Sequence, residues 1–149
     1  MAGHMPTQTS DVGATRGVQA LHGVLLIGLI SITTVFALVL RLRHIQELVP
    51  GARVAGYVMA GFSVLCLVLA ILILRPRVPR RTASDQSTDT YWAQDENRAT
   101  ALTLWVVCEG AGIVSAVGYV MTGNLVPLGT VLLSIVVLVL LGPKTLAAS

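Results

Sequence analysis

The chain has 149 residues, of which 54% are hydrophobic and only 11% are charged, and its mean hydropathy is +0.80. A soluble domain carries about a quarter charged residues, so this composition indicates a lipid environment. The ten Lys and Arg exceed the seven Asp and Glu, which in an apolar chain serves membrane orientation and contact with anionic head-groups. Nucleic acid is not expected as a partner, because aromatic residues interleaved with basic ones are missing.

Residues 1–17 form a polar N-terminal tail, and residues 18–149 form one domain with four apolar stretches. Each stretch reaches or approaches the ~20 helical residues that cross ~30 Å of hydrocarbon. A sheet is excluded, because lipid offers no partner to an open strand edge and no alternating barrel pattern appears. The sequence therefore predicts an all-α integral membrane bundle of four transmembrane helices, which cover residues 18–40, 54–74, 99–121 and 125–142.

Turn and cap residues separate the predicted spans. Asn124 and Pro127 are typical of a helix cap and a first helical turn, and Gly142-Pro143 ends the fourth span. The connection between the third and fourth spans, Thr122-Gly123-Asn124, is short enough to require antiparallel neighbours. The four helices are therefore expected to form two antiparallel hairpins, and the first span is interpreted as an uncleaved signal-anchor.

The distribution of basic residues predicts the orientation of the chain. If both termini and the 75–98 loop share one side of the membrane, the opposite side carries only three basic residues, Arg41, Arg43 and Arg53. The shared side carries Arg16, Arg75, Arg77, Arg80, Arg81, Arg98 and Lys144. Because basic residues collect on the cytoplasmic side, we expect a bacterial inner-membrane protein with a cytoplasmic 75–98 loop and both termini in the cytoplasm.

The 75–98 loop has a basic half and an acidic half. Its basic half lies beside the membrane and suits anionic lipid phosphates; it consists of Arg75, Arg77, Arg80 and Arg81. In the acidic half, Tyr91-Trp92 stands among several carboxylates. Two interpretations are open, a solvated linker with one interfacial aromatic anchor and a docking segment for a soluble partner.

Glu109 is the one formally charged residue within the predicted spans, about 15 Å into the third. An ionised carboxylate at that depth costs about 2.5 kcal/mol or more, unless it is protonated or hydrogen-bonded inside the bundle. His22 is a candidate partner, although it is expected to lie roughly 9 Å shallower, and the indole of Trp105 is a second. Glu109 is therefore interpreted either as a neutral acid that fixes helix register or, with His22, as a proton or cation site.

Small residues surround Glu109 at helical spacing. Gly112 and Ala116 share its face, while Ser115 and Gly118 belong to an adjacent stripe, and Gly110 is also interpreted as a packing glycine. Small residues allow membrane helices to approach closely, so the third span is expected to be the most enclosed.

Two resemblances involve this helix. The run Arg98-Ala99-Thr100-Ala101-Leu102, followed by Cys108-Glu109-Gly110-Ala111-Gly112-Ile113 and Gly118-Tyr119, resembles the carboxylate helix of rotary ATPase proteolipid subunits. That resemblance implies a proton- or sodium-binding role for Glu109. The ending of the helix, Tyr119 with Thr122-Gly123-Asn124, resembles small uncharacterised bacterial four-helix membrane proteins, which implies no particular activity.

No catalytic set is recognisable, and we expect a non-enzyme without cofactor or metal. The chain lacks HExxH, paired carboxylates, a Ser-His-Asp set and a phosphate loop, and Cys66 and Cys108 are interpreted as small buried hydrophobes. The leading hypothesis is an accessory or structural subunit, in a homo-oligomer or a larger membrane complex. The alternative is a proton- or cation-handling proteolipid-like oligomer that uses Glu109, and a small multidrug-type transporter ranks third.

Overall fold

The computed structural model describes residues 13–42, 49, 51–79 and 87–148, and within these ranges it contains helices and turns but no strand. Its elements are α1 (Ala14–Leu42), α2 (Arg53–Leu69) with a π-helical turn (Ala70–Leu74) and a 3-10 turn (Arg75–Arg77), α3 (Thr88–Ala93), α4 (Asp95–Thr122), α5 (Leu125–Leu140) and α6 (Pro143–Ala148). The all-α prediction is confirmed for this part of the chain.

Three helices are long and apolar enough to cross a membrane, namely Ala14–Leu42, Arg53–Arg77 and Asp95–Thr122. They support the prediction of an integral membrane protein. The fourth predicted span corresponds to α5, which has 16 residues. At 1.5 Å per residue α5 is about 24 Å long, less than the ~30 Å of a typical hydrocarbon core.

Two helices begin about one turn before the predicted start of their span. α1 begins at Ala14 rather than at residue 18, and α4 begins at Asp95 rather than at residue 99. The 75–98 segment is also more structured than a loop, because it contains α3. Ser87 caps α3, and its hydroxyl accepts a hydrogen bond from the Thr90 backbone N–H at 3.1 Å.

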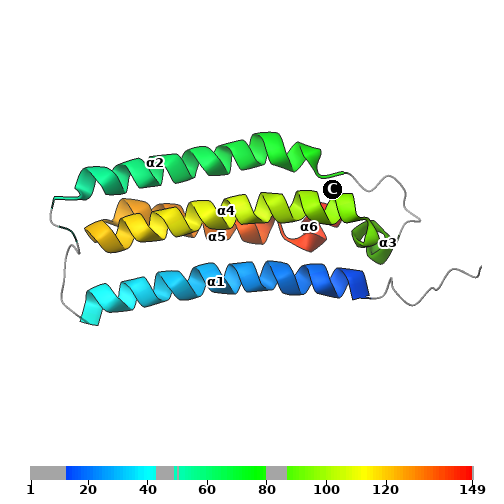
Figure 1. The fold of residues 1–149 in the computed structure, drawn as a ribbon, viewed down its shortest axis with the longest axis horizontal. Coiled ribbons are helices and arrows are strands. Elements are labelled where there is room, and N and C mark those ends of the chain that lie inside the picture. Colours follow the sequence, from blue (N-terminus) through cyan, green and yellow to red (C-terminus); the bar gives the residue numbers. More distant parts are fainter. Residues whose placement is uncertain (1–12, 43–48, 50, 80–86, 149) are drawn as a thin grey trace, which may run out of the picture.

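α4 lies at the centre of the fold, with α5 beside it and with α1 and α2 on opposite sides (Figure 1). The described parts of α1 and α2 make no extended contact, so the expected first hairpin is not a packed pair. The reason lies in small residues of α4 that admit a helix on each side. Gly112 lies against Leu29 of α1, and Gly118 lies against Met59 of α2.

The turn between α4 and α5 has the predicted cap. Gly123 adopts φ 63°, a left-handed conformation that favours glycine, and its N–H donates to the Tyr119 carbonyl at 2.7 Å. The Asn124 side chain accepts from the Val126 N–H at 2.9 Å and donates to the Tyr57 hydroxyl at 2.9 Å. The turn therefore ties α4, α5 and α2 together at one end of the bundle.

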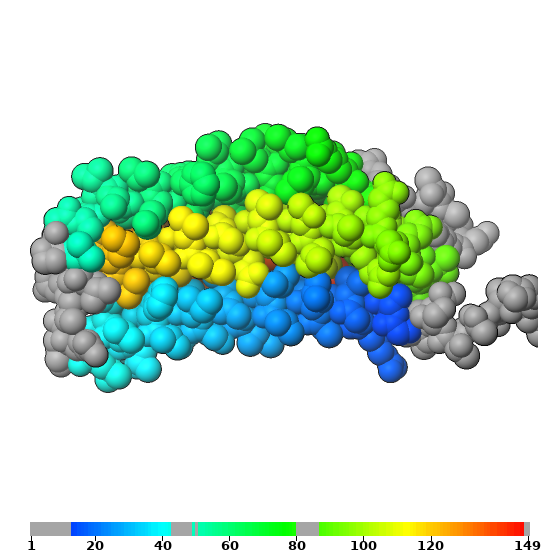
Figure 2. Space-filling model, viewed as in Figure 1, coloured from blue at the N-terminus to red at the C-terminus, as the bar shows by residue number. Residues whose placement is uncertain are grey.

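The outer surface of the helices is apolar. α1, α4 and α2 together cover the face shown in Figure 2. Large apolar side chains point outward from α1 and α2, and the most exposed include Val24 at 68% and Val54 at 72%. Contiguous exposed apolar surface of this extent is typical of a lipid-facing protein. α4 is the most buried of the three long helices, in line with the expectation that the third predicted span is well enclosed.

Candidate functional site

Glu109 lies near the middle of α4, at the edge of its buried face. Trp105 and Gly112, about one turn away on either side, are buried, whereas Leu102 is exposed. The side chain of Glu109 points towards α1, where its Oε1 lies 3.5 Å from the position that a Cβ would take at Gly28. Because Gly28 has no side chain, it leaves room for the carboxyl group between the two helices.

The carboxyl group of Glu109 is half-buried and makes no hydrogen bond or ion pair within the described ranges. Gly28 lies near the middle of α1, as Glu109 does of α4, so the carboxyl group is far from both helix ends. Hydrocarbon offers it no donor, and an ionised carboxylate near the bilayer centre costs about 2.5 kcal/mol or more. This is an acidic group that needs either a proton or a donor from outside the described chain.

His22 does not meet Glu109. It lies six residues before Gly28 on α1, which corresponds to about 9 Å along the helix and agrees with the depth difference expected from the sequence. Its Nε2–H donates to the Leu138 carbonyl at 2.9 Å, and its ring packs edge-on against Trp105 with centroids 4.9 Å apart. The hypothesis of one site made of His22 and Glu109 therefore has no support from the geometry.

Trp105 does not serve Glu109 either, because its indole N–H donates to the Leu141 carbonyl at 2.7 Å. The last carbonyls of a helix have no partner within the helix and need one from elsewhere. His22 and Trp105 supply such partners at the end of α5. Their role in this structure is to tie α1 and α4 to the end of α5.

The rings of Tyr91 and Trp92 belong to the same buried cluster. Trp92 lies 6.2 Å from Trp105 and 4.8 Å from Tyr91 between ring centroids. The Tyr91 hydroxyl donates to the Pro79 carbonyl at 2.7 Å, and burial raises the pKa of this phenol. Both rings are buried because α3 packs against α1 and α4. Buried inside the chain's own fold, neither ring is placed as an interfacial anchor or as an anchor for a soluble partner, the two interpretations drawn from the sequence. The Ser87 cap could have indicated the short helix.

The predicted packing residues divide into two groups. Ser115 and Ala116 are fully buried, and side chains at Gly112 or Gly118 would lie too close to neighbouring helices. A Cβ at Gly110, in contrast, would meet nothing within 4 Å, so Gly110 does not bring two helices together as expected.

Sequence reasoning missed Gly56 on α2. A Cβ there would lie 2.7 Å from Cγ2 of Thr122 on α4. Gly56 is followed four residues later by Ala60, which is also buried. This spacing of two small residues is a known signature of close helix contact and could have identified the position.

Of the predicted lipid-contacting arginines, Arg75 and Arg77 are exposed in the 3-10 turn after α2, while Arg80 and Arg81 lie outside the described residues. In the part of the chain that the structure covers, no three His, Cys, Asp or Glu side chains lie together as a metal site would require. Comparison with protein-family models, curated proteins and solved structures finds no match to this chain.

Proposed function

We propose that this chain is a non-enzymatic subunit of a membrane assembly, either a homo-oligomer or a larger complex, in the bacterial inner membrane. It crosses the membrane four times, with both termini in the cytoplasm. The observation that carries the assembly proposal is the unpartnered carboxyl group of Glu109 beside Gly28.

The direction of the helices supports four crossings. His22 and then Leu29 of α1 lie beside Trp105 and then Gly112 of α4, so α1 and α4 run in the same direction. A chain that runs twice in one direction must return between the two helices, and α2 provides this return. After the two-residue turn, α5 runs back along α4. Its short length fits a transmembrane helix that ends below the membrane surface.

The surroundings of Glu109 support a helix of another chain as its partner. Leu102, two turns before Glu109 on α4, is exposed, and Val24, one turn before Gly28 on α1, is exposed at 68%. We call Val24, Gly28, Leu102 and Glu109 the Glu109 seam. A neighbouring helix along this seam would bring a donor to the carboxyl group and cover apolar side chains at the same time. Polar groups serve in this way as contacts between membrane helices, at about 0.6–2 kcal/mol each.

Site-specific photo-crosslinking in native membranes tests the assembly proposal. A benzophenone amino acid in place of Val24 is expected to give a discrete protein adduct. The same substitution at Val58, exposed on α2, serves as the matched control and is expected to give less. Glu109→Leu should abolish the Val24 adduct, whereas Glu109→Gln should keep it, because an amide still forms hydrogen bonds. A Val24 variant without an adduct, or an adduct unchanged by Glu109→Leu, would contradict the proposal.

A proton- or cation-handling oligomer is the second candidate, and it draws on the same observation. A carboxyl group beside a glycine, without a donor, can hold a proton that it later releases. Dicyclohexylcarbodiimide, which modifies protonated carboxyl groups in apolar surroundings, should then label Glu109. Glu109→Gln separates the two candidates. If the chain handles protons, this variant should abolish proton flux in liposomes. If the chain is a subunit of an assembly, the variant should keep the Val24 adduct.

A further inference from the structure

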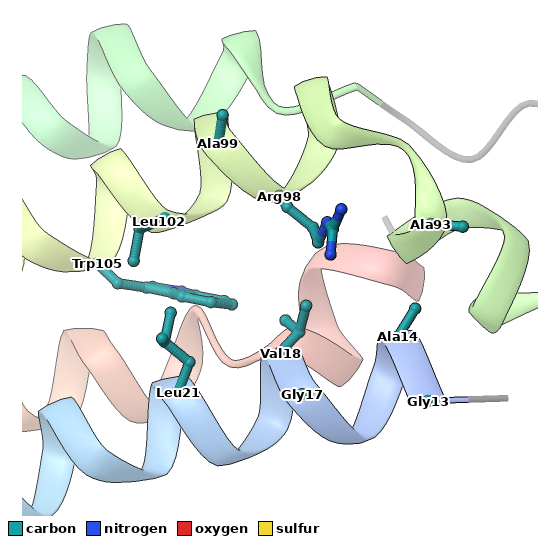
Figure 3. A pocket seen from close by; sticks show the side chains of 10 residues that line it. All are labelled: Gly13, Ala14, Gly17, Val18, Leu21, Ala93, Arg98, Ala99, Leu102 and Trp105. Atoms are coloured by element: carbon teal, nitrogen blue, oxygen red, sulfur yellow. The ribbon is translucent and has the colours of Figure 1, made fainter. Parts of the chain in front are cut away.

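A groove runs between the first turns of α1 and the first turns of α4, at the end of the bundle near α3. Figure 3 shows its lining, which includes Gly13 just before α1, Gly17 and Leu21 of α1, and Arg98, Leu102 and Trp105 of α4. Its volume is about 680 Å³, within the ~300–1,000 Å³ of known ligand pockets.

On its α1 side the groove is open because two of its lining residues there are glycines. A Cβ at Gly13 or Gly17 would meet nothing within 4 Å. α5 ends at Leu140, about level with Trp105, so it does not extend between the first turns of α1 and α4. The chain continues into α6, which contacts α1 at this end but contributes no residue to the lining of the groove.

The groove has a cationic end and an apolar end. Arg98 directs its guanidinium group into the space between α4 and α1, and Trp105 lies at the other end (Figure 3). The two residues are about 10 Å apart along α4. Arg98 also pairs with Asp95 through one terminal nitrogen, but Asp95 is 92% exposed and does not line the groove. A guanidinium group has five N–H donors, so most remain for an anion.

The direction of this polarity matches that of a lipid. Arg98 is near the start of α4, whereas Trp105 lies further along the helix and therefore deeper in the membrane. A phospholipid likewise has its phosphate at the surface and its acyl chains inside. We propose that the groove binds one anionic phospholipid of the surrounding bilayer, with its phosphate at Arg98 and one acyl chain extending to Trp105. This inference needs the membrane location of the chain but no partner protein.

The two tryptophans of the chain offer a direct test. In Trp92→Phe, Trp105 is the remaining tryptophan, and the substitution removes an indole N–H that has no hydrogen-bond partner. This variant is reconstituted into phosphatidylcholine nanodiscs with a small fraction of phosphatidylglycerol. Bromine on the acyl chains of either lipid quenches tryptophan fluorescence at short range. We expect brominated phosphatidylglycerol to quench Trp105 more strongly than the same fraction of brominated phosphatidylcholine.

Charge and space are then altered separately in the Trp92→Phe background. Arg98→Gln should lower the preference for phosphatidylglycerol about fivefold, the equivalent of ~1 kcal/mol for one arginine near anionic lipid. Arg41→Gln, exposed in the last turn of α1 at the other end of that helix, is the charge control and should change it little. Gly17→Leu should abolish quenching because it fills the groove, whereas Gly61→Leu, at an open position on α2, should not. If Gly17→Leu does not fold, Gly13→Leu, at a second open position in the lining, replaces it.

Three results would overturn the proposal. The first is equal quenching by the two brominated lipids in Trp92→Phe. The second is a preference for phosphatidylglycerol that survives Arg98→Gln, or quenching that survives the filling of the groove. The third is quenching that appears only after residues 1–12 are deleted, which would mean that the N-terminal segment of the chain, and not a lipid, occupies the groove.

Discussion

Replacing Gly112 by alanine tests whether α1 is held against α4 by the absence of a side chain. A Cβ at Gly112 would lie 2.7 and 2.8 Å from the two δ carbons of Leu29, and 3.1 Å from Cβ of Ser134. Side-chain ends can often move aside, but Leu29 is 0% exposed and its methyl groups are enclosed on all sides. The Ser134 Cβ is fixed to the backbone of α5 and cannot rotate away. Gly112→Ala must therefore separate α1, α4 and α5 locally.

The magnitude follows from a comparison with Gly110→Ala in the same helix. Either alanine gains about 1 kcal/mol of helix propensity over glycine, and this gain cancels when the two variants are compared. Gly110 has nothing within 4 Å of a new Cβ, so its variant carries no clash. Overpacking a well-packed site costs about 1–3 kcal/mol. Gly112→Ala should thus have a free energy of unfolding about 1–3 kcal/mol below that of Gly110→Ala.

The assay is unfolding by sodium dodecyl sulfate in mixed micelles, followed by circular dichroism. Gly112→Ala should unfold at a lower fraction of the denaturing detergent than Gly110→Ala. Adding Leu29→Ala to Gly112→Ala should cost less than the sum of the single changes, because the smaller residue removes the clash. Equal midpoints for the two glycine variants would refute the close approach of α1 and α4 at Gly112.

Two further predictions concern the aromatic cluster. His22→Phe keeps a ring against Trp105 but loses the hydrogen-bond donor to the Leu138 carbonyl. The free energy of unfolding, measured in the same assay, should therefore fall by about 1 kcal/mol. An unchanged value would show that this hydrogen bond does not stabilise the end of α5. The raised pKa of Tyr91 keeps its phenol neutral in the folded chain above the ordinary value of 10.0, while the unfolded phenol ionises, so stability should decrease as the pH rises past that value. Tyr91→Phe should flatten this decrease above about pH 10, and an equally steep decrease in the variant would assign it to another group.

Local sequence signals predicted the helical elements well. Apolar stretches predicted the long helices, and Asn124 with the following proline predicted the start of α5. These features depend on residues close together in the chain, since a helix is formed by hydrogen bonds between near neighbours. The depth difference between His22 and Glu109 was equally predictable, because each residue adds a fixed rise along its helix.

The tertiary structure alone decided what each polar residue meets. A helix that is apolar all round has no strong periodicity to indicate which side faces inward, so hydropathy does not specify its rotation or its neighbours. For this reason the sequence paired His22 or Trp105 with Glu109, whereas both donate to carbonyls near the end of α5. It also treated Gly110 and Gly112 alike, although only Gly112 meets another helix. Composition and hydropathy determined that the chain forms helices suited to lipid, and the packing of those helices determined that Glu109 faces Gly28.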